Sequence, residues 1–78
     1  MTAPTRDLSI RGESIRLGQA LKLAGLAESG GEARALVEEG AVTVNGEIET
    51  RRGRQLRHGD VVALGDDALR IAAREGAP

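Results

Sequence analysis

The fold of this chain is decided by residues 15–62, which read IRLGQALKLAGLAESGGEARALVEEGAVTVNGEIETRRGRQLRHGDVV. Up to Gly40 the apolar residues recur three and four positions apart, which is the period of a helix. From Ala41 they alternate with polar residues, which is the period of a strand. The stretch therefore predicts two helices followed by a small β-sheet.

The first helix is expected over residues 17–24. Its apolar face consists of Leu17, Ala20, Leu21 and Ala24. Gly25 follows at the place where a helix is commonly closed by a residue in the left-handed conformation.

The second helix is expected to begin at Ser29. The Ser29 hydroxyl can cap the amide of Glu32, and the Glu32 carboxylate can return the hydrogen bond. Arg34 and Glu38 stand four positions apart on its polar side, and Gly40 is expected to end it. Only about four residues join the two helices, so we expect them to pack as neighbours.

A hairpin is predicted at Asn45-Gly46. A two-residue loop would place both Val42 and Val44 opposite acidic residues. A three-residue loop over residues 44–46, with Gly46 in a bulge, instead pairs Val42 with Ile48 and gathers the apolar side chains on one face. We therefore expect the bulged hairpin.

Further strands are expected where turn residues flank short apolar runs, at residues 7–11, 61–64 and 69–71. The predicted fold class is α+β, with two short packed helices followed by a small antiparallel β-sheet of about four to five short strands.

Composition bounds the class of protein. The chain has 78 residues, 40% of them hydrophobic, with 11 basic and 12 acidic side chains and no cysteine or aromatic residue. We expect a single domain over residues 8–73, with a motif core at 15–62 and flexible ends at 1–7 and 74–78. The lack of cysteine excludes disulfides, and no apolar run approaches the roughly 20 residues that a membrane span needs. We expect a cytoplasmic protein with no membrane partner.

The residue inventory argues against an enzyme. It holds one histidine, His58, and three serines, and no spacing supplies a nucleophile, a base and an orienting group. Phosphate-binding loops, dinucleotide fingerprints and metal-ligand runs are also missing from the sequence. We therefore expect no catalysis, no metal and no cofactor, and we interpret His58 as an exposed loop residue.

Two features could bind an anion. Four arginines fall within seven positions, at Arg51, Arg52, Arg54 and Arg57, with no acidic residue up to Gly59. They form either a solvated loop or a basic surface. At the start of the second helix, free amides and Gly30-Gly31 would admit a phosphate, although the Glu32 carboxylate would repel it.

The order of these parts resembles the αL RNA-binding motif, also called the S-four domain, and within it the stand-alone bacterial YbcJ-like family. The matching pieces are Arg16-Leu17, Gly25-Leu26, residues 29–33, Gly40, residues 42–46 and residues 59–61. The resemblance implies a non-catalytic domain that docks on structured RNA, most often ribosomal or transfer RNA. We expect a monomer that acts in ribosome assembly or translation.

The resemblance, together with the distribution of basic residues, implies a set of phosphate contacts. Many members of the family carry a basic residue directly after the serine that caps the second helix, where this chain has Gly30-Gly31. The residues expected to contact RNA are Arg16, Lys22, Ser29, Gly30, Gly31, Arg34, Asn45, Arg51, Arg52, Arg54 and Arg57. We expect the arginines beyond the hairpin to share one side of the molecule with the helices.

The lack of aromatic rings bears on the mode of binding, because readers of single strands commonly stack bases on such rings. Recognition would instead use phosphates, 2′-hydroxyls and the shape of a folded RNA. Two other functions stay open: a protein-docking module of the same fold, and a ubiquitin-like sulfur-carrier protein. The carrier is disfavoured because its chemistry needs a terminal Gly-Gly, whereas this chain ends Glu75-Gly76-Ala77-Pro78.

Overall fold

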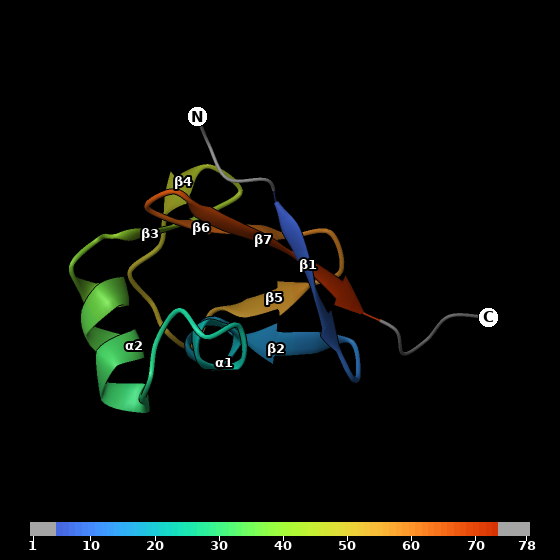
Figure 1. Cartoon of the computed structure of the whole chain (residues 1–78), viewed down its shortest axis with the longest axis horizontal. Coiled ribbons are helices and arrows are strands. Elements are labelled where there is room, and N and C mark those ends of the chain that lie inside the picture. Colours follow the sequence, from blue (N-terminus) through green and yellow to red (C-terminus); the bar gives the residue numbers. More distant parts are fainter. Residues whose placement is uncertain (1–4, 74–78) are drawn as a thin grey trace.

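A computed structural model describes residues 5–73 of the chain (Figure 1). The elements in chain order are β1 (Arg6–Ile10), β2 (Ser14–Arg16), α1 (Leu17–Leu23), α2 (Gly30–Glu38), β3 (Val42–Val44), β4 (Glu47–Ile48), β5 (Gln55–Arg57), β6 (Val61–Leu64) and β7 (Asp67–Ala73). The α+β class is confirmed. The ends expected to be flexible lie outside the described residues except for 5–7, and Arg6 and Asp7 belong to β1.

Five strands form one sheet in the order β1-β7-β6-β3-β4, and β2 and β5 form a second, two-stranded sheet. The large sheet is antiparallel apart from β1, which runs parallel to β7 with Leu8 opposite Ile71. The small sheet places Ile15 opposite Leu56. Strands β2 and β5 were not predicted from the sequence, because each has a single apolar residue, Ile15 or Leu56, and so shows no alternation, whereas β3 has two valines.

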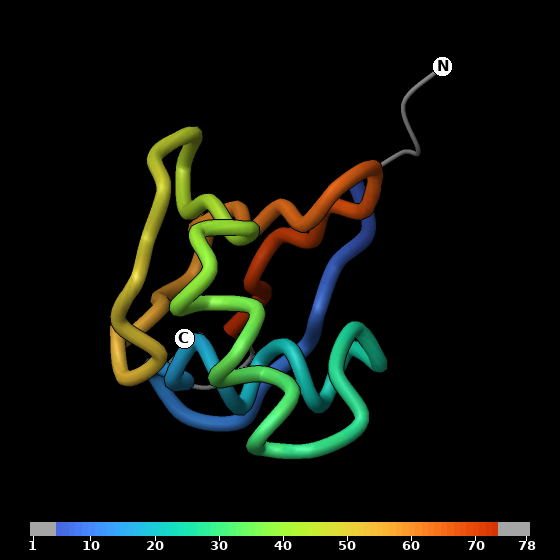
Figure 2. The backbone as a smooth tube through the Cα atoms, turned by 90° about the vertical axis from the view of Figure 1, so that its left-hand side faces the viewer, coloured from blue at the N-terminus to red at the C-terminus, as the bar shows by residue number. Residues whose placement is uncertain are grey.

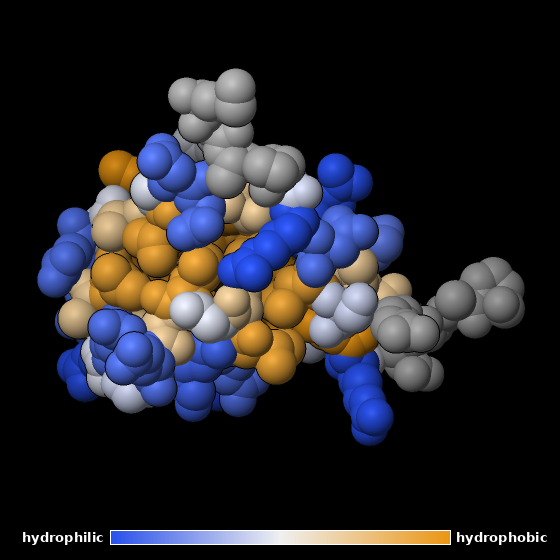
Figure 3. Space-filling view, viewed as in Figure 1, coloured by the Kyte–Doolittle hydropathy of each residue, from blue (hydrophilic) through white to orange (hydrophobic). Residues whose placement is uncertain are grey.

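The core lies between the helices and the large sheet. Its largest fully buried side chains are Leu17, Leu21, Leu56, Leu69, Ile71, Val37, Val42, Val44 and Val62. Ala20 and Ala33 are also buried, which lets α1 and α2 approach closely. On the face that Figures 1 and 3 share, apolar residues occupy the centre and hydrophilic residues surround them.

Both helices end as predicted. Gly25 has φ 80° after α1, and Gly40 has φ 79° after α2. The Ser29 Oγ accepts a hydrogen bond from the Glu32 amide at 3.1 Å. The Glu32 carboxylate returns a bond to the amide of Glu28, one residue earlier than expected, at 2.6 Å. These contacts fix the start of α2.

The prediction of a bulged hairpin is wrong. Val44 lies opposite Glu47, so the loop consists of Asn45 and Gly46 alone. Their φ values of 53° and 88° are those of a tight turn that matches the twist of the flanking strands. The prediction assumed that Ile48 joins the core and that an acid cannot, yet Ile48 is 67% exposed and Glu49 only 6%.

The segment that follows the hairpin links the β3–β4 hairpin to the region around the start of α1. In Figure 2 this segment, coloured yellow, runs from the β3–β4 hairpin down to the start of α1. Residues far apart in the sequence therefore lie side by side there, and their contacts define the site described below.

Within residues 5–73, no helix has the length and apolar character to cross a membrane.

Candidate nucleic-acid interface

The loop between β4 and β5 carries three of the predicted arginines, and we call residues 50–54 the arginine loop. Its backbone caps α1: the Leu17 amide donates to the Arg54 carbonyl at 2.8 Å, and the Gly18 amide donates to the Arg52 carbonyl at 2.9 Å. The first amides of a helix have no partner within the helix, and the side chain of the N-cap residue Arg16 makes no capping hydrogen bond at the start of α1. The arginine loop is therefore joined to the start of α1 by main-chain hydrogen bonds.

Glu49 binds the same loop from inside. Its carboxylate accepts hydrogen bonds from the Arg51 amide and Nε, both at 3.0 Å, and from Arg54 Nη1 at 3.0 Å. The side-chain bonds from Arg51 and Arg54 and the Arg51 amide lower the pKa of Glu49 to about 2. The carboxylate is therefore charged at neutral pH and neutralises part of the charge of these two arginines.

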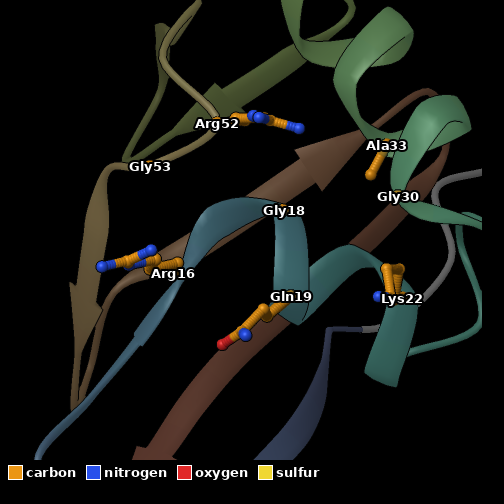
Figure 4. A pocket seen from close by; sticks show the side chains of 8 residues that line it. All are labelled: Arg16, Gly18, Gln19, Lys22, Gly30, Ala33, Arg52 and Gly53. Atoms are coloured by element: carbon orange, nitrogen blue, oxygen red, sulfur yellow. The ribbon is translucent and has the colours of Figure 1, made fainter.

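A hollow of about 200 Å³ lies where α1, α2 and the arginine loop meet (Figure 4). The residues that line it are Arg16, Gly18, Gln19, Lys22, Gly30, Ala33, Arg52 and Gly53. Arg16, Lys22 and Arg52 are cationic, and no acidic residue of the described chain is among the lining residues. In Figure 4 the side chain of Arg52 reaches from the loop toward α2. Such a concave basic site attracts anions.

Arg51 and Arg54 line a neighbouring hollow with Gly53 and Gln55. Gly53 lines both hollows, so the arginine loop separates them. The structure thus divides the predicted cluster, with Arg52 in one hollow beside the helices and Arg51 and Arg54 in the other, both held by Glu49.

Asn45 belongs to the hairpin rather than to either hollow. Its side-chain amide donates to Asp60 Oδ1 at 3.1 Å, and its oxygen accepts from the Val61 amide at 2.9 Å. Partial burial tends to raise the pKa of Asp60, but bonds from the Arg57 amide and Asn45, together with nearby arginines, lower it overall. Asn45 therefore stabilises the turn.

The remaining predicted residues lie outside the first hollow. Ser29 caps α2, and Gly31 follows it in the first turn. Arg34 is exposed and pairs with Glu38 at 3.0 Å. Arg57 is exposed on β5, and its amide donates to Asp60. His58 is exposed as expected, and its Nδ1 accepts a hydrogen bond from the Ala73 amide at 3.1 Å.

Sequence reasoning missed five residues of this region: Gly18, Gln19, Ala33 and Gly53, which line the hollow, and Glu49. Gln19 could have been found, because it stands one helical turn before Lys22. Gly18 had no local signal, since its contact is with Arg52, which only the fold brings close. Glu49 contacts Arg51 and Arg54, which are near it in the sequence, but the sequence does not show that its carboxylate is buried.

Comparison with known proteins identifies the family. Residues 8–72 match the model of the S4 domain, and the chain belongs to this family. The resemblance found in the sequence is therefore confirmed.

Two curated relatives are similar over most of their length. Over 57 residues the chain is 51% identical to "Probable ribosome maturation protein RlbA" of Bacillus subtilis. The aligned stretch covers 73% of this chain and 80% of that protein. Over 59 residues the chain is 34% identical to "Putative RNA-binding protein YbcJ" of Escherichia coli. This alignment covers 76% of this chain and 84% of that protein.

Proposed function

We propose that this protein is a non-catalytic, monomeric RNA-binding factor of the cytoplasm that docks on structured ribosomal RNA during ribosome maturation. The observation that carries the proposal is the hollow that Arg16, Lys22 and Arg52 line, with no acidic residue of the described chain among its lining residues. The family and the names of the two relatives support the choice of RNA as the anion.

The three cations come from different elements, which makes the site selective for shape. Arg16 ends β2, Lys22 lies in α1, and Arg52 lies in the arginine loop. A ligand that meets all three must present phosphates at matching separations. Phosphates of a folded RNA hold such separations, whereas those of a flexible strand must first be ordered.

The start of α2 adds backbone to the same hollow. Gly30 lines it, and a side chain built at Gly30 would meet open space. A phosphate can therefore approach the main chain there more closely than it could at a larger residue. This arrangement suits the proposal that backbone at Gly30-Gly31 replaces the basic residue common in the family.

The overall charge favours selective binding. With 11 basic and 12 acidic residues, the chain lacks the excess of positive charge that drives non-specific binding. Affinity must then come from the few cations placed in the hollow. We expect weak binding to arbitrary polyanions and stronger binding to an RNA of suitable shape.

The decisive experiment compares two double variants with equal charge. R16A/R52A removes two cations of the hollow, and R11A/R70A removes two exposed arginines that do not line it. We expect R16A/R52A to lose at least about tenfold in affinity for ribosomal RNA fragments and R11A/R70A to lose much less. Fluorescence anisotropy at fixed salt measures both.

Equal losses in the two variants would refute the assignment of the hollow. Wild-type protein that binds no ribosomal RNA would refute the function itself. Association with ribosomal particles that persists after ribonuclease treatment would favour the protein-docking module.

A further inference from the structure

Glu49 is the one buried polar or charged residue within residues 5–73. It stands next to the surface proposed to bind RNA. A negative charge at that place weakens the attraction of phosphates, and on charge alone its removal should strengthen binding. The contacts of Glu49 point to the opposite result.

The carboxylate holds both ends of the loop segment that contains Arg52. One oxygen accepts bonds from the amide and Nε of Arg51, and the other accepts from Arg54 Nη1 at 3.0 Å. Arg52 and Gly53 lie between these two anchors. The Arg54 amide also donates to the Arg51 carbonyl at 3.2 Å, which closes the turn.

The outer side of the loop is fixed by α1. The Arg52 carbonyl accepts from the Gly18 amide at 2.9 Å, and a Cβ built at Gly18 would lie 3.7 Å from the Cβ of Arg52. The loop therefore rests directly on the helix. The Glu49 carboxylate on one side and α1 on the other hold the backbone of Arg52 in place at the edge of the hollow.

We propose that Glu49 is a positioning residue for RNA binding, which fixes the arginine loop so that Arg52 stands in the hollow with Arg16 and Lys22. This inference rests on the proposed function and deepens it. Glu49 touches no RNA in this scheme and acts through Arg52.

The test compares E49Q with E47Q, two substitutions that each remove one negative charge from the same hairpin. Glu47 is exposed in β4, and the described chain gives it no hydrogen bond or ion pair to the arginine loop. We expect E49Q to bind a structured ribosomal RNA fragment about tenfold more weakly than wild type, and E47Q to bind equally well or more tightly. Heparin retention, which reports bulk charge, should rise in both variants.

A double-mutant cycle tests whether Glu49 acts through Arg52. The substitution R52A should weaken RNA binding in the wild-type background and have little further effect in E49Q. A purely structural role of Glu49 would leave the effect of R52A unchanged. RNA binding by E49Q as tight as that of E47Q would overturn the proposal.

Two further measurements keep the outcomes apart. Should E49Q not fold, E49D preserves the charge but shortens the reach to the arginines, and we expect it to lose RNA affinity with heparin retention unchanged. Amide hydrogen exchange at Leu17 and Gly18 should accelerate in E49Q or E49D, and unchanged exchange would overturn the positioning role without any RNA. Failure of wild type to bind RNA, with accelerated exchange in the variant, would refute only the proposed function.

Discussion

The amide of Gly18 donates a hydrogen bond to the carbonyl of Arg52 at 2.9 Å, which joins the start of α1 to a loop far along the chain. Through this bond the most basic segment of the sequence comes to lie beside the helices. A hollow forms there, and its cations come from β2, α1 and the loop.

Salt dependence reports the number of phosphate contacts. If Arg16, Lys22 and Arg52 each neutralise one phosphate, the logarithm of the affinity should fall with the logarithm of salt concentration with a slope of about −2 to −3. The variant R52A should make this slope shallower by about 0.7 to 0.9. Binding titrations from low to high salt measure both slopes, and an unchanged slope in R52A would remove Arg52 from the interface.

The lack of aromatic residues predicts a preference for folded RNA. A ribosomal RNA hairpin should compete for the protein more effectively than a single strand of the same length and composition, because base stacking on aromatic rings contributes nothing here. Competition anisotropy measures the ratio of the two affinities. Equal competition by the two RNAs would contradict recognition by shape.

Acid should destabilise the fold through Glu49. Hydrogen bonds from Arg51 and Arg54 lower its pKa from 4.5 to about 2, so in the folded state the carboxylate keeps its charge to lower pH than in the unfolded state. Its contribution is complete above about pH 4.5 and is lost as the pH falls toward 2, because the unfolded chain then binds the proton more readily.

The measurement is urea unfolding of wild type and E49Q at a series of pH values. The free energy of unfolding of wild type should fall more steeply than that of E49Q between about pH 4.5 and pH 2. Parallel curves in this window would show that Glu49 does not hold its arginines in solution.

Core packing should depend strongly on α1. Leu21 is fully buried, whereas Leu23 on the same helix is 60% exposed. The substitution L21A should lower the free energy of unfolding by about 2 to 5 kcal/mol, because it leaves a cavity. The matched variant L23A should lower it by less than about 1 kcal/mol. Thermal unfolding followed by circular dichroism distinguishes them, and similar midpoints would contradict the burial of this face.

The tight hairpin turn depends on Gly46, whose φ is 88°. The substitution G46A should destabilise the protein by about 1 to 2 kcal/mol, because a side chain disfavours the left-handed region. G53A provides the control, since Gly53 is outside that region and has open space around it. Equal stability of the two variants would contradict the left-handed conformation of Gly46.

Much of the fold could be predicted from local patterns. The apolar residues of α1 recur at helical spacing, Ser29 caps α2, and Gly25 and Gly40 close the two helices. These features depend on neighbours within four positions in the chain, and such short-range contacts are legible in sequence. The hairpin was predicted at the correct place, Asn45-Gly46, but with the wrong loop length, because a buried acidic side chain was thought unfavourable.

What sequence alone determined is therefore the α+β order of elements, the positions of the caps and turns, and the presence of a basic cluster after the hairpin. Tertiary structure alone decided that Glu49 is buried, that β2 pairs with β5, and that Arg52 lines the same hollow as Arg16 and Lys22 while Arg51 and Arg54 line another. The physical reason is the separation along the chain between the residues that interact. A cap or turn forms between neighbours in the chain, whereas a buried charge is stable only once distant parts of the chain enclose it and its partners are in place.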